Sequence, residues 1–218
     1  MRAVVPARTF ARAKSRLTPA LSGEERASLA EAMLAHVVGI LAASGAVDST
    51  LVVADDEGVA ACARGLGAEA MVHAPGLGPS VAAAVARVRA DGDAVFVAMA
   101  DLIALSVEDV RAMICASDGG RLALAPDRHE DGTSALVSPA GMNVRTRFGE
   151  RGSFALHTGD ARAAGVATVV VRRPGLALDI DLPEDLALAG ISVAAVRAAG
   201  SARPGSWTES SRTSLPRR

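Results

Sequence analysis

The sequence predicts an α/β protein with a mostly parallel sheet and helices on both faces. Short, almost continuously apolar runs alternate along the chain with longer segments of helical periodicity. Strands of a parallel sheet have this composition because helices bury both of their faces. The core must be built mainly from Ala, Val and Leu, since the 218 residues include only four Phe, one Trp and no Tyr.

The expected elements alternate in order. The first strand is expected at 2–6, and the first helix, 23–43, begins at Ser22 and Glu25, whose spacing is that of a capping box. Further strands are expected at 49–54, 70–73, 94–99 and 167–171, and further helices at 59–66, 76–90, 106–115 and 153–163. The helix at 106–115 begins at Ser106 and Asp109, a second pair with the spacing of a capping box. The strand at 94–99 is the most apolar, so we expect it at the centre of the sheet.

The regular alternation loosens after residue 121. The apolar runs 122–126 and 134–137 flank a polar loop, 127–133, and we expect them to form a small hairpin-like insertion. One domain, 1–197, is expected, followed by a disordered tail, 198–218, in which Ser, Arg, Pro and Thr dominate.

Composition excludes several classes of function. Twenty-three Lys and Arg nearly balance 24 Asp and Glu, for a formal net charge of -1, so nucleic acid is not an expected partner. Cys62 and Cys115 belong to no metal-type pair and are expected to be reduced thiols. Met1 runs directly into the first strand without a signal peptide, and we expect no apolar run long enough to span a membrane. A soluble cytoplasmic protein is predicted.

A basic loop follows the first strand. Arg8, Arg12, Lys14 and Arg16 lie within ten residues of it, at the sheet edge where α/β folds bind ligands. Fixed positive charge in a partly desolvated cleft is the natural counterpart of a polyphosphate. The alternative is a solvated basic loop without a ligand.

Carboxylates end two later apolar segments. Asp101 follows the expected central strand, and Asp179 and Asp181 share one face of an extended segment because they are two residues apart. Carboxylates from separate strands that face a basic loop suit Mg²⁺ bound together with substrate phosphates. The alternative for each is a helix or turn cap, and Glu184 and Asp185 are expected to have that role after Pro183.

Several motifs occur in an order that resembles the phospholactate guanylyltransferase family, which acts in coenzyme F-420 biosynthesis. The resemblance covers residues 2–189 and implies a nucleotide-diphospho-sugar transferase-like fold. Its motifs are Val4-Val5-Pro6, Arg12-Ala13-Lys14-Ser15-Arg16-Leu17, Ala100-Asp101-Leu102, Ala125-Pro126-Asp127-Arg128, Gly132-Thr133, Phe148-Gly149, Gly152-Ser153-Phe154, His157, Leu178-Asp179-Ile180-Asp181 and Pro183-Glu184-Asp185-Leu186.

The resemblance implies a reaction in which GTP and a three-carbon phosphorylated acid combine and pyrophosphate leaves. The acid would be phosphoenolpyruvate, 3-phospho-D-glycerate or 2-phospho-L-lactate. The implied catalytic residues are Lys14, Arg16, Asp101 and Asp181, of which the two Asp would hold Mg²⁺. GTP would be bound by Arg12, Lys14, Arg16 and Gly76, and the acid by Thr133, Gly149 and Ser153. His157 is a further candidate beside the acid, and a homodimer is expected.

Some positions depart from the family pattern and leave alternatives open. Ile103, Ser134, Leu182, Leu156 and Gly78 stand where the family usually has Pro, Asn, Thr, Arg and Asn. These changes question the substrate more than the reaction type. One alternative is a molybdenum-cofactor guanylyltransferase, although the loop 7–17 lacks the glycines of that group. The other is a nucleotide-binding regulator without turnover.

Overall fold

The computed structural model describes residues 1–200, with the side chains of residues 1–197. Seven strands form one sheet in the order β3-β2-β1-β4-β6-β5-β7, and β6 alone runs antiparallel to its neighbours. The strands are β1 (Arg2–Ala7), β2 (Ser49–Ala54), β3 (Glu69–Val72), β4 (Val95–Ala98), β5 (Leu122–Pro126), β6 (Thr133–Ser138) and β7 (Thr168–Val170). The expected mostly parallel sheet is confirmed, with β4 at its centre.

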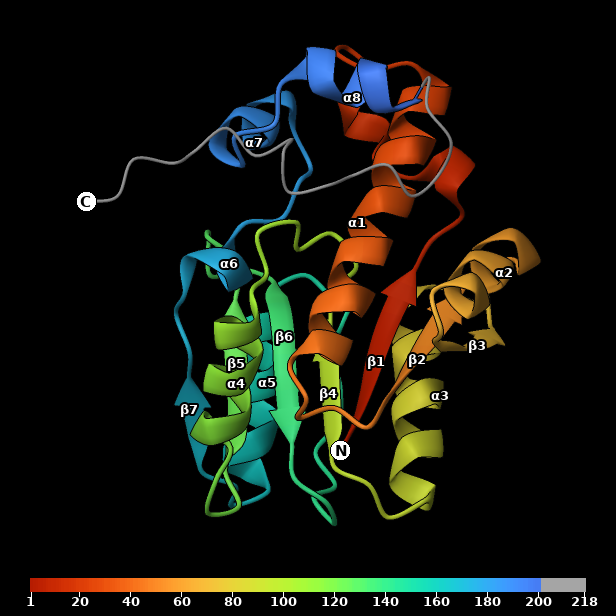
Figure 1. The fold of residues 1–218 in the computed structure, drawn as a ribbon. Coiled ribbons are helices and arrows are strands. Elements are labelled where there is room, and N and C mark those ends of the chain that lie inside the picture. Colours follow the sequence, from red (N-terminus) through yellow and green to blue (C-terminus); the bar gives the residue numbers. More distant parts are fainter. Residues whose placement is uncertain (201–218) are drawn as a thin grey trace.

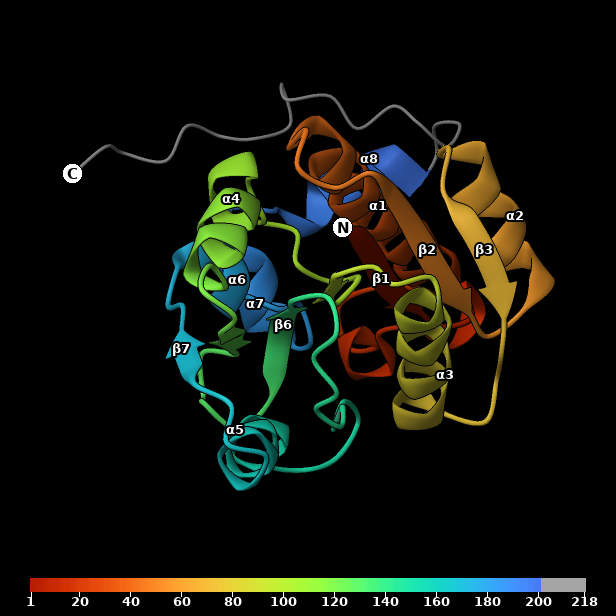
Figure 2. The same ribbon diagram turned by 90° about the horizontal axis from the view of Figure 1, so that it is seen from below.

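Helices cover both faces of this sheet, as expected. Seen along the sheet, α1, α2 and α4 lie on one side and α3 and α5 on the other (Figure 2). The helices are α1 (Gly23–Ala43), α2 (Glu57–Gly65), α3 (Leu77–Ala90), α4 (Val107–Ala116), α5 (Ser153–Ala163), α6 (Pro174–Ala177), α7 (Pro183–Leu188) and α8 (Val193–Gly200), with the 3₁₀ helices η1 (Phe10–Arg12) and η2 (Ser15–Leu17). The first three residues of the predicted tail, 198–200, belong to α8, and the rest of it, 201–218, lies outside the described residues.

The two predicted helix starts are confirmed in atomic detail. At α1 the Ser22 hydroxyl accepts the Glu25 N–H, and the Glu25 carboxylate accepts the Ser22 N–H. Ser106 and Asp109 make the same reciprocal pair at α4. Each pair satisfies two backbone N–H groups that a helix start leaves without an intrahelical acceptor.

The expected hairpin-like insertion is part of the main sheet. Its strands β5 and β6 pair antiparallel, but β6 also pairs with β4, and β5 also pairs with β7. Both strands are buried along their whole length, which is the environment of interior strands. The hairpin therefore continues the sheet past its central strand and carries Thr133 to the edge at which β4 ends.

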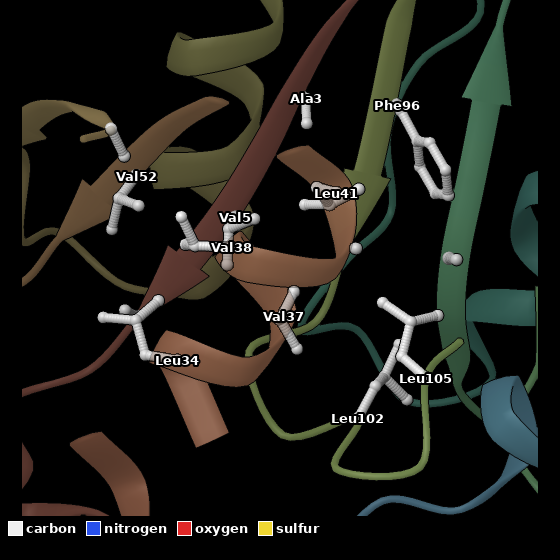
Figure 3. Packing of buried hydrophobic residues seen from close by; sticks show 14 of the residues in the cluster. Ala3, Val5, Leu34, Val37, Val38, Leu41, Val52, Phe96, Leu102 and Leu105 are labelled. Atoms are coloured by element: carbon white, nitrogen blue, oxygen red, sulfur yellow. The ribbon is translucent and has the colours of Figure 1, made fainter. Parts of the chain in front are cut away.

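The larger core lies between α1 and the sheet (Figure 3). Leu34, Val37, Val38 and Leu41 of α1 pack over the side chains of β1, β2 and β4. Leu102 and Leu105, from the segment that follows β4, extend this core beyond the strand end. Packing of these two leucines anchors the backbone that directly follows Asp101.

By length and composition α1 is apolar enough to cross a membrane, so the expectation that no run reaches this length was wrong. It has 21 residues with a mean hydropathy of 1.4 over its most apolar window. Its buried side chains lie against the sheet and against the C-terminal helices: Leu29, Met33, Leu34, Val37, Val38 and Leu41. Such packing is how a core helix of a folded domain uses its apolar face.

A third apolar cluster lies beyond the sheet edge at which β1 ends. There α8 lies beside the first half of α1, and α7 lies above α6 (Figure 1). Leu17 of η2 and Ile180 are fully buried together in this cluster. The cluster therefore joins the basic loop after β1 to the segment that carries Asp179 and Asp181.

Candidate active site

The basic loop brings one lysine back over the sheet edge. Lys14 lies between η1 and η2 with a left-handed backbone, φ 52° and ψ 41°. This conformation is uncommon for residues with a side chain, and it persists only where the surrounding structure fixes it. Here the buried Leu17 and the Leu17 N–H, which donates to the Lys14 carbonyl, fix the turn. The strained turn aims the ammonium inward.

Lys14 bridges two carboxylates from distant parts of the chain. Its Nζ lies 2.6 Å from Asp101 Oδ2 and 3.1 Å from Asp181 Oδ1. Burial alone would lower the pKa of this ammonium, but attraction to Asp101 and Asp181 outweighs burial and raises the pKa. Arg16 Nη1 lies 3.3 Å from Asp181 Oδ2, and its side chain is 72% exposed against 10% for Lys14. Lys14 is the inner cation and Arg16 the outer one.

Asp179 completes a cluster of three carboxylates. One oxygen each of Asp101, Asp179 and Asp181 lies within 4.8 Å of the others. Burial, and then repulsion from Asp101, raises the pKa of Asp179 to about 6. Asp101 Oδ1 is buried and has no hydrogen-bond partner among the described residues. Hard oxygen donors with one unsatisfied atom fit a cation such as Mg²⁺. We call Lys14, Arg16 and these three residues the Lys14 cluster.

The sequence reasoning placed Asp179 on the same face as Asp181 but did not include it among the metal ligands. The i, i+2 spacing was the available signal. It could not show that the segment 178–182 approaches Asp101, because that approach depends on the burial of Ile180 in the third apolar cluster. The structure therefore extends the predicted pair Asp101 and Asp181 to three carboxylates.

Asp185 holds the Asp181 segment in place. Its Oδ2 accepts the backbone N–H groups of Asp181 at 2.8 Å and Leu182 at 2.6 Å, the helix-start role predicted for it. Its other oxygen lies 2.6 Å from Arg128 Nη2, and the side chain of Asp185 is almost fully buried. Arg128 thus joins the loop between β5 and β6 to the start of α7.

A second group of polar side chains is neutral and buried. The Thr133 hydroxyl lies 3.0 Å from His157 Nδ1 and 3.3 Å from Ser153 Oγ. His157 is fully buried, and its Nε2 accepts the Arg147 backbone N–H at 2.8 Å. The ring of Phe148 contacts the imidazole edge to face, with centroids 5.0 Å apart. We call Thr133, Ser153 and His157 the Thr133 group.

Burial lowers the pKa of His157 to about 4, against 6.5 for an unperturbed imidazole. The hydrogen bonds agree with this direction, because a ring nitrogen that accepts a backbone N–H cannot carry a proton itself. The imidazole is therefore neutral at physiological pH.

Gly76 and Gly149, the two glycines predicted to bind ligands, both lie at the start of α3. Gly149, at φ +81°, packs so closely on the start of α3 that a Cβ would lie 3.1 Å from the Gly78 nitrogen. A Cβ on Gly78 would in turn lie 2.7 Å from the Phe148 carbonyl oxygen, so an Asn cannot replace this glycine without a shift. Gly76 precedes α3 at φ +119°, and Arg12 is exposed at the end of η1.

The Lys14 cluster and the Thr133 group share one edge of the sheet. The Met99 N–H donates to the Ser134 carbonyl, so the chain just before Asp101 runs beside the start of β6. Lys14, Arg16, Asp101 and Asp181 are brought into contact, as are Thr133 and Ser153. Among the described residues, no hydrogen bond or ion pair joins Arg12 or Gly76 to either group.

A family model described as "Guanylyl transferase CofC like" matches residues 1–192. Phosphoenolpyruvate guanylyltransferase of Sphaerobacter thermophilus is 37% identical over 187 residues, which cover 84% of this chain and 89% of that protein. Phosphoenolpyruvate guanylyltransferase of Rubrobacter xylanophilus is 38% identical over 189 residues, which cover 85% of this chain and 91% of that protein.

Solved structures share the fold at much lower identity. A Desulfovibrio desulfuricans G20 protein that is named for the nucleotide-diphospho-sugar transferases superposes with a TM-score of 0.71 at 15% identity, over 93% of this chain and 96% of that chain. The 4-diphosphocytidyl-2C-methyl-D-erythritol synthase of Anaerococcus prevotii superposes with a TM-score of 0.57 at 10% identity, over 86% of this chain and 94% of that chain. The expected fold family is confirmed.

Proposed function

Because the chain belongs to the CofC-like guanylyl transferase family, we propose that it couples GTP to a three-carbon phosphorylated acid and releases pyrophosphate. The observation that carries this proposal is the pairing of two anion sites at one edge of the sheet. The Lys14 cluster combines cations with carboxylates, and the neutral Thr133 group lies beside it. A nucleotide triphosphate and a smaller anion are the substrates that such a pair suits.

The reaction needs no nucleophile from the protein. A phosphate oxygen of the acid attacks the α-phosphorus of GTP, the bond to the bridging oxygen of the β-phosphate breaks, and pyrophosphate leaves. Both reactants are anions, so the protein must place them in line and offset their charge. Lys14 and Arg16 are the cations that we assign to the triphosphate, with Arg12 as an outer cation and the backbone at Gly76 beside the nucleoside.

We assign a divalent cation to the carboxylates of the Lys14 cluster. Asp101 and Asp181 would hold it with help from Asp179, because all three offer oxygen atoms and Asp101 Oδ1 lacks another partner among the described residues. The cation supplies charge neutralisation on the phosphates when it is bound. Mg²⁺ is our choice, since it prefers one or two carboxylates together with substrate phosphates.

We assign the phosphate and carboxylate of the acid to Thr133, Ser153 and the backbone at Gly149. The side chains of Thr133 and Ser153 offer hydroxyl donors, and Ser153 begins α5, whose first N–H groups lack intrahelical acceptors. Phosphoenolpyruvate is the first candidate acid because the curated relatives carry it in their names. 3-Phospho-D-glycerate and 2-phospho-L-lactate are the next candidate acids. We place the reaction in coenzyme F-420 biosynthesis. A cytoplasmic location and a homodimer stay predictions.

The test is pyrophosphate release from GTP and Mg²⁺ with each of the three acids in turn. ATP and CTP replace GTP in parallel reactions, and omission of Mg²⁺ or of the acid gives the background. We expect release with GTP and one acid only. Equal rates with ATP or CTP would contradict guanylyl selectivity. GTP binding without release in any mixture would favour a non-catalytic regulator. A further reaction with a molybdopterin acceptor in place of the acid tests the other alternative, and release in that reaction alone would favour a molybdenum-cofactor guanylyltransferase.

A further inference from the structure

His157 has a fixed tautomer, and the structure shows which one. Its Nε2 accepts the backbone N–H of Arg147 at 2.8 Å, so that nitrogen carries the lone pair. The proton of the neutral ring is therefore on Nδ1, and Nδ1 lies 3.0 Å from Thr133 Oγ1. The imidazole therefore donates toward the Thr133 oxygen, and the Ser153 backbone carbonyl is a second acceptor for the same hydrogen.

The group that sets this tautomer is itself anchored to the same helix. Arg147 Nε and Nη2 lie 2.6 and 3.1 Å from the two carboxylate oxygens of Asp160, which is on α5 one turn after His157. This bidentate pair holds the Arg147 backbone over the ring. Phe148 packs against the imidazole edge to face and excludes water from it.

Thr133 is oriented as a consequence. Its oxygen receives the Nδ1 hydrogen of His157 and lies 3.3 Å from the Ser153 hydroxyl. An oxygen that accepts one hydrogen bond from the interior has its own hydrogen left to donate elsewhere. The Ser153 hydroxyl donates to the same oxygen, and among the described residues the Thr133 hydroxyl makes no hydrogen bond as a donor, so its hydrogen is left for a molecule at the sheet edge.

We propose that His157 is a positioning residue for the phosphorylated acid: its Nδ1–H holds the Thr133 oxygen and thereby presents the Thr133 hydroxyl hydrogen to the bound anion. The inference rests on the proposed function, since it takes Thr133 as part of the acid's site. His157 makes no contact with the anion itself. The Thr133 hydroxyl is thus an uncharged donor whose direction is already fixed. Binding of the anion therefore does not have to order the Thr133 side chain.

Two substitutions separate this role from packing. Asn places an amide N–H near the position of Nδ1 and keeps the donor to Thr133, whereas Gln places its amide near Nε2 and keeps only the acceptor for Arg147. We expect His157→Gln to raise KM for phosphoenolpyruvate about tenfold with KM for GTP unchanged, and His157→Asn to stay within about threefold of the wild type. Circular dichroism and thermal unfolding of both variants provide the folding control.

Combination with Thr133 variants tests the coupling. In a Thr133→Val background, His157→Gln should raise KM for phosphoenolpyruvate no further, because the hydroxyl that it orients is gone. In a Thr133→Ser background, the single-variant effect of His157→Gln should return. Equal effects of Asn and Gln at 157, or additive effects of His157→Gln and Thr133→Val, would overturn the proposal.

A spectroscopic readout does not depend on turnover. Nitrogen-15 NMR of the histidine ring should show the Nδ1-protonated neutral form in the wild type. Phosphoenolpyruvate, 3-phospho-D-glycerate or 2-phospho-L-lactate should shift the Nδ1–H signal, and GTP with Mg²⁺ should not. A proton on Nε2, or an Nδ1–H signal that none of the three acids moves, would overturn the inference. Absence of pyrophosphate release together with a shifted signal would reject the proposed reaction and leave the positioning role standing.

Discussion

The Lys14 cluster and the Thr133 group lie at the same edge of the sheet but are built from different chemistry. The Lys14 cluster contains five charged side chains, with Arg16 and Asp181 open to solvent. The Thr133 group contains two hydroxyls and a neutral imidazole, all buried. Charges at an open edge can offset a triphosphate and a cation that arrive from solvent, whereas buried neutral donors can fix the direction of a smaller anion. We propose that the two regions divide the binding of the two substrates between them.

The difference extends to what holds each region in place. Side chains of the Lys14 cluster come from three distant segments, two of which the third apolar cluster joins through Leu17 and Ile180. The Thr133 group comes from β6 and α5, and every one of its members is hydrogen-bonded to another or to the backbone. Loss of a partner should therefore change charge balance in the first region and donor direction in the second.

The largest effect is expected for Asp101→Asn. It removes the charge of the central carboxylate, so pyrophosphate release should fall on the order of 10³-fold, and Mn²⁺ binding measured calorimetrically should weaken in parallel. Glu184→Gln is the matched control, because it neutralises an exposed carboxylate in the first turn of α7, close to Asp181. Near-normal turnover of Asp101→Asn would remove this residue from the site.

Lys14→Ala should separate nucleotide from metal binding. Its ammonium now lies between Asp101 and Asp181, so its removal should strengthen binding of Mn²⁺ alone while turnover with GTP falls about 10²-fold. Calorimetric titrations with Mn²⁺, with and without GTP, measure both effects. Unchanged GTP affinity and unchanged turnover would show that Lys14 does not contact the triphosphate.

His157 should make the fold sensitive to acid. Its folded pKa of about 4 lies below the unperturbed 6.5, so the unfolded chain binds more protons between these values. Stability from this residue is present above pH 6.5 and is lost as pH falls, by about 2 kcal/mol between pH 7 and pH 5. The raised pKa of Asp179 acts in the opposite direction over this range. Urea unfolding of wild type and His157→Asn at both pH values isolates the His157 contribution, and identical pH dependence of the two proteins would contradict it.

Asp185→Ala should have the smallest effect on turnover, about tenfold, because Asp185 acts on Asp181 only through the backbone. Asp185→Asn retains an oxygen for the two N–H groups and should recover part of the loss, although it removes the charge that faces Arg128. Glu184→Ala provides the exposed neighbour as control. Full activity of Asp185→Ala would show that Asp181 needs no support from the helix start.

Local signals predicted much of this arrangement. Ser22 with Glu25 and Ser106 with Asp109 placed two helices, because a capping box depends on residues three positions apart. The apolar run before Asp101 placed the central strand, since burial of both faces leaves a composition that can be read locally. The family resemblance predicted that Lys14, Asp101 and Asp181 share one site, and in the structure Lys14 contacts both carboxylates.

Long-range contacts account for what was not predicted. The sequence predicts an insertion where β5 and β6 continue the sheet, because local patterns do not show which strand pairs with β4. The third carboxylate, Asp179, and the partner of Arg128 depend on how the segment before α7 folds back over the sheet. The tautomer of His157 is set by the backbone N–H of Arg147, and the spacing of residues in the sequence does not predict this contact.

The division of substrates between the two regions is tested most directly by measuring KM for GTP and for the acid in Arg16→Ala and Thr133→Val side by side. Arg16→Ala should raise KM for GTP by about fivefold and leave KM for the acid unchanged. Thr133→Val should raise KM for the acid by about tenfold and leave KM for GTP unchanged. If either variant raised both constants together, the two regions would form a single binding surface and the account would be wrong.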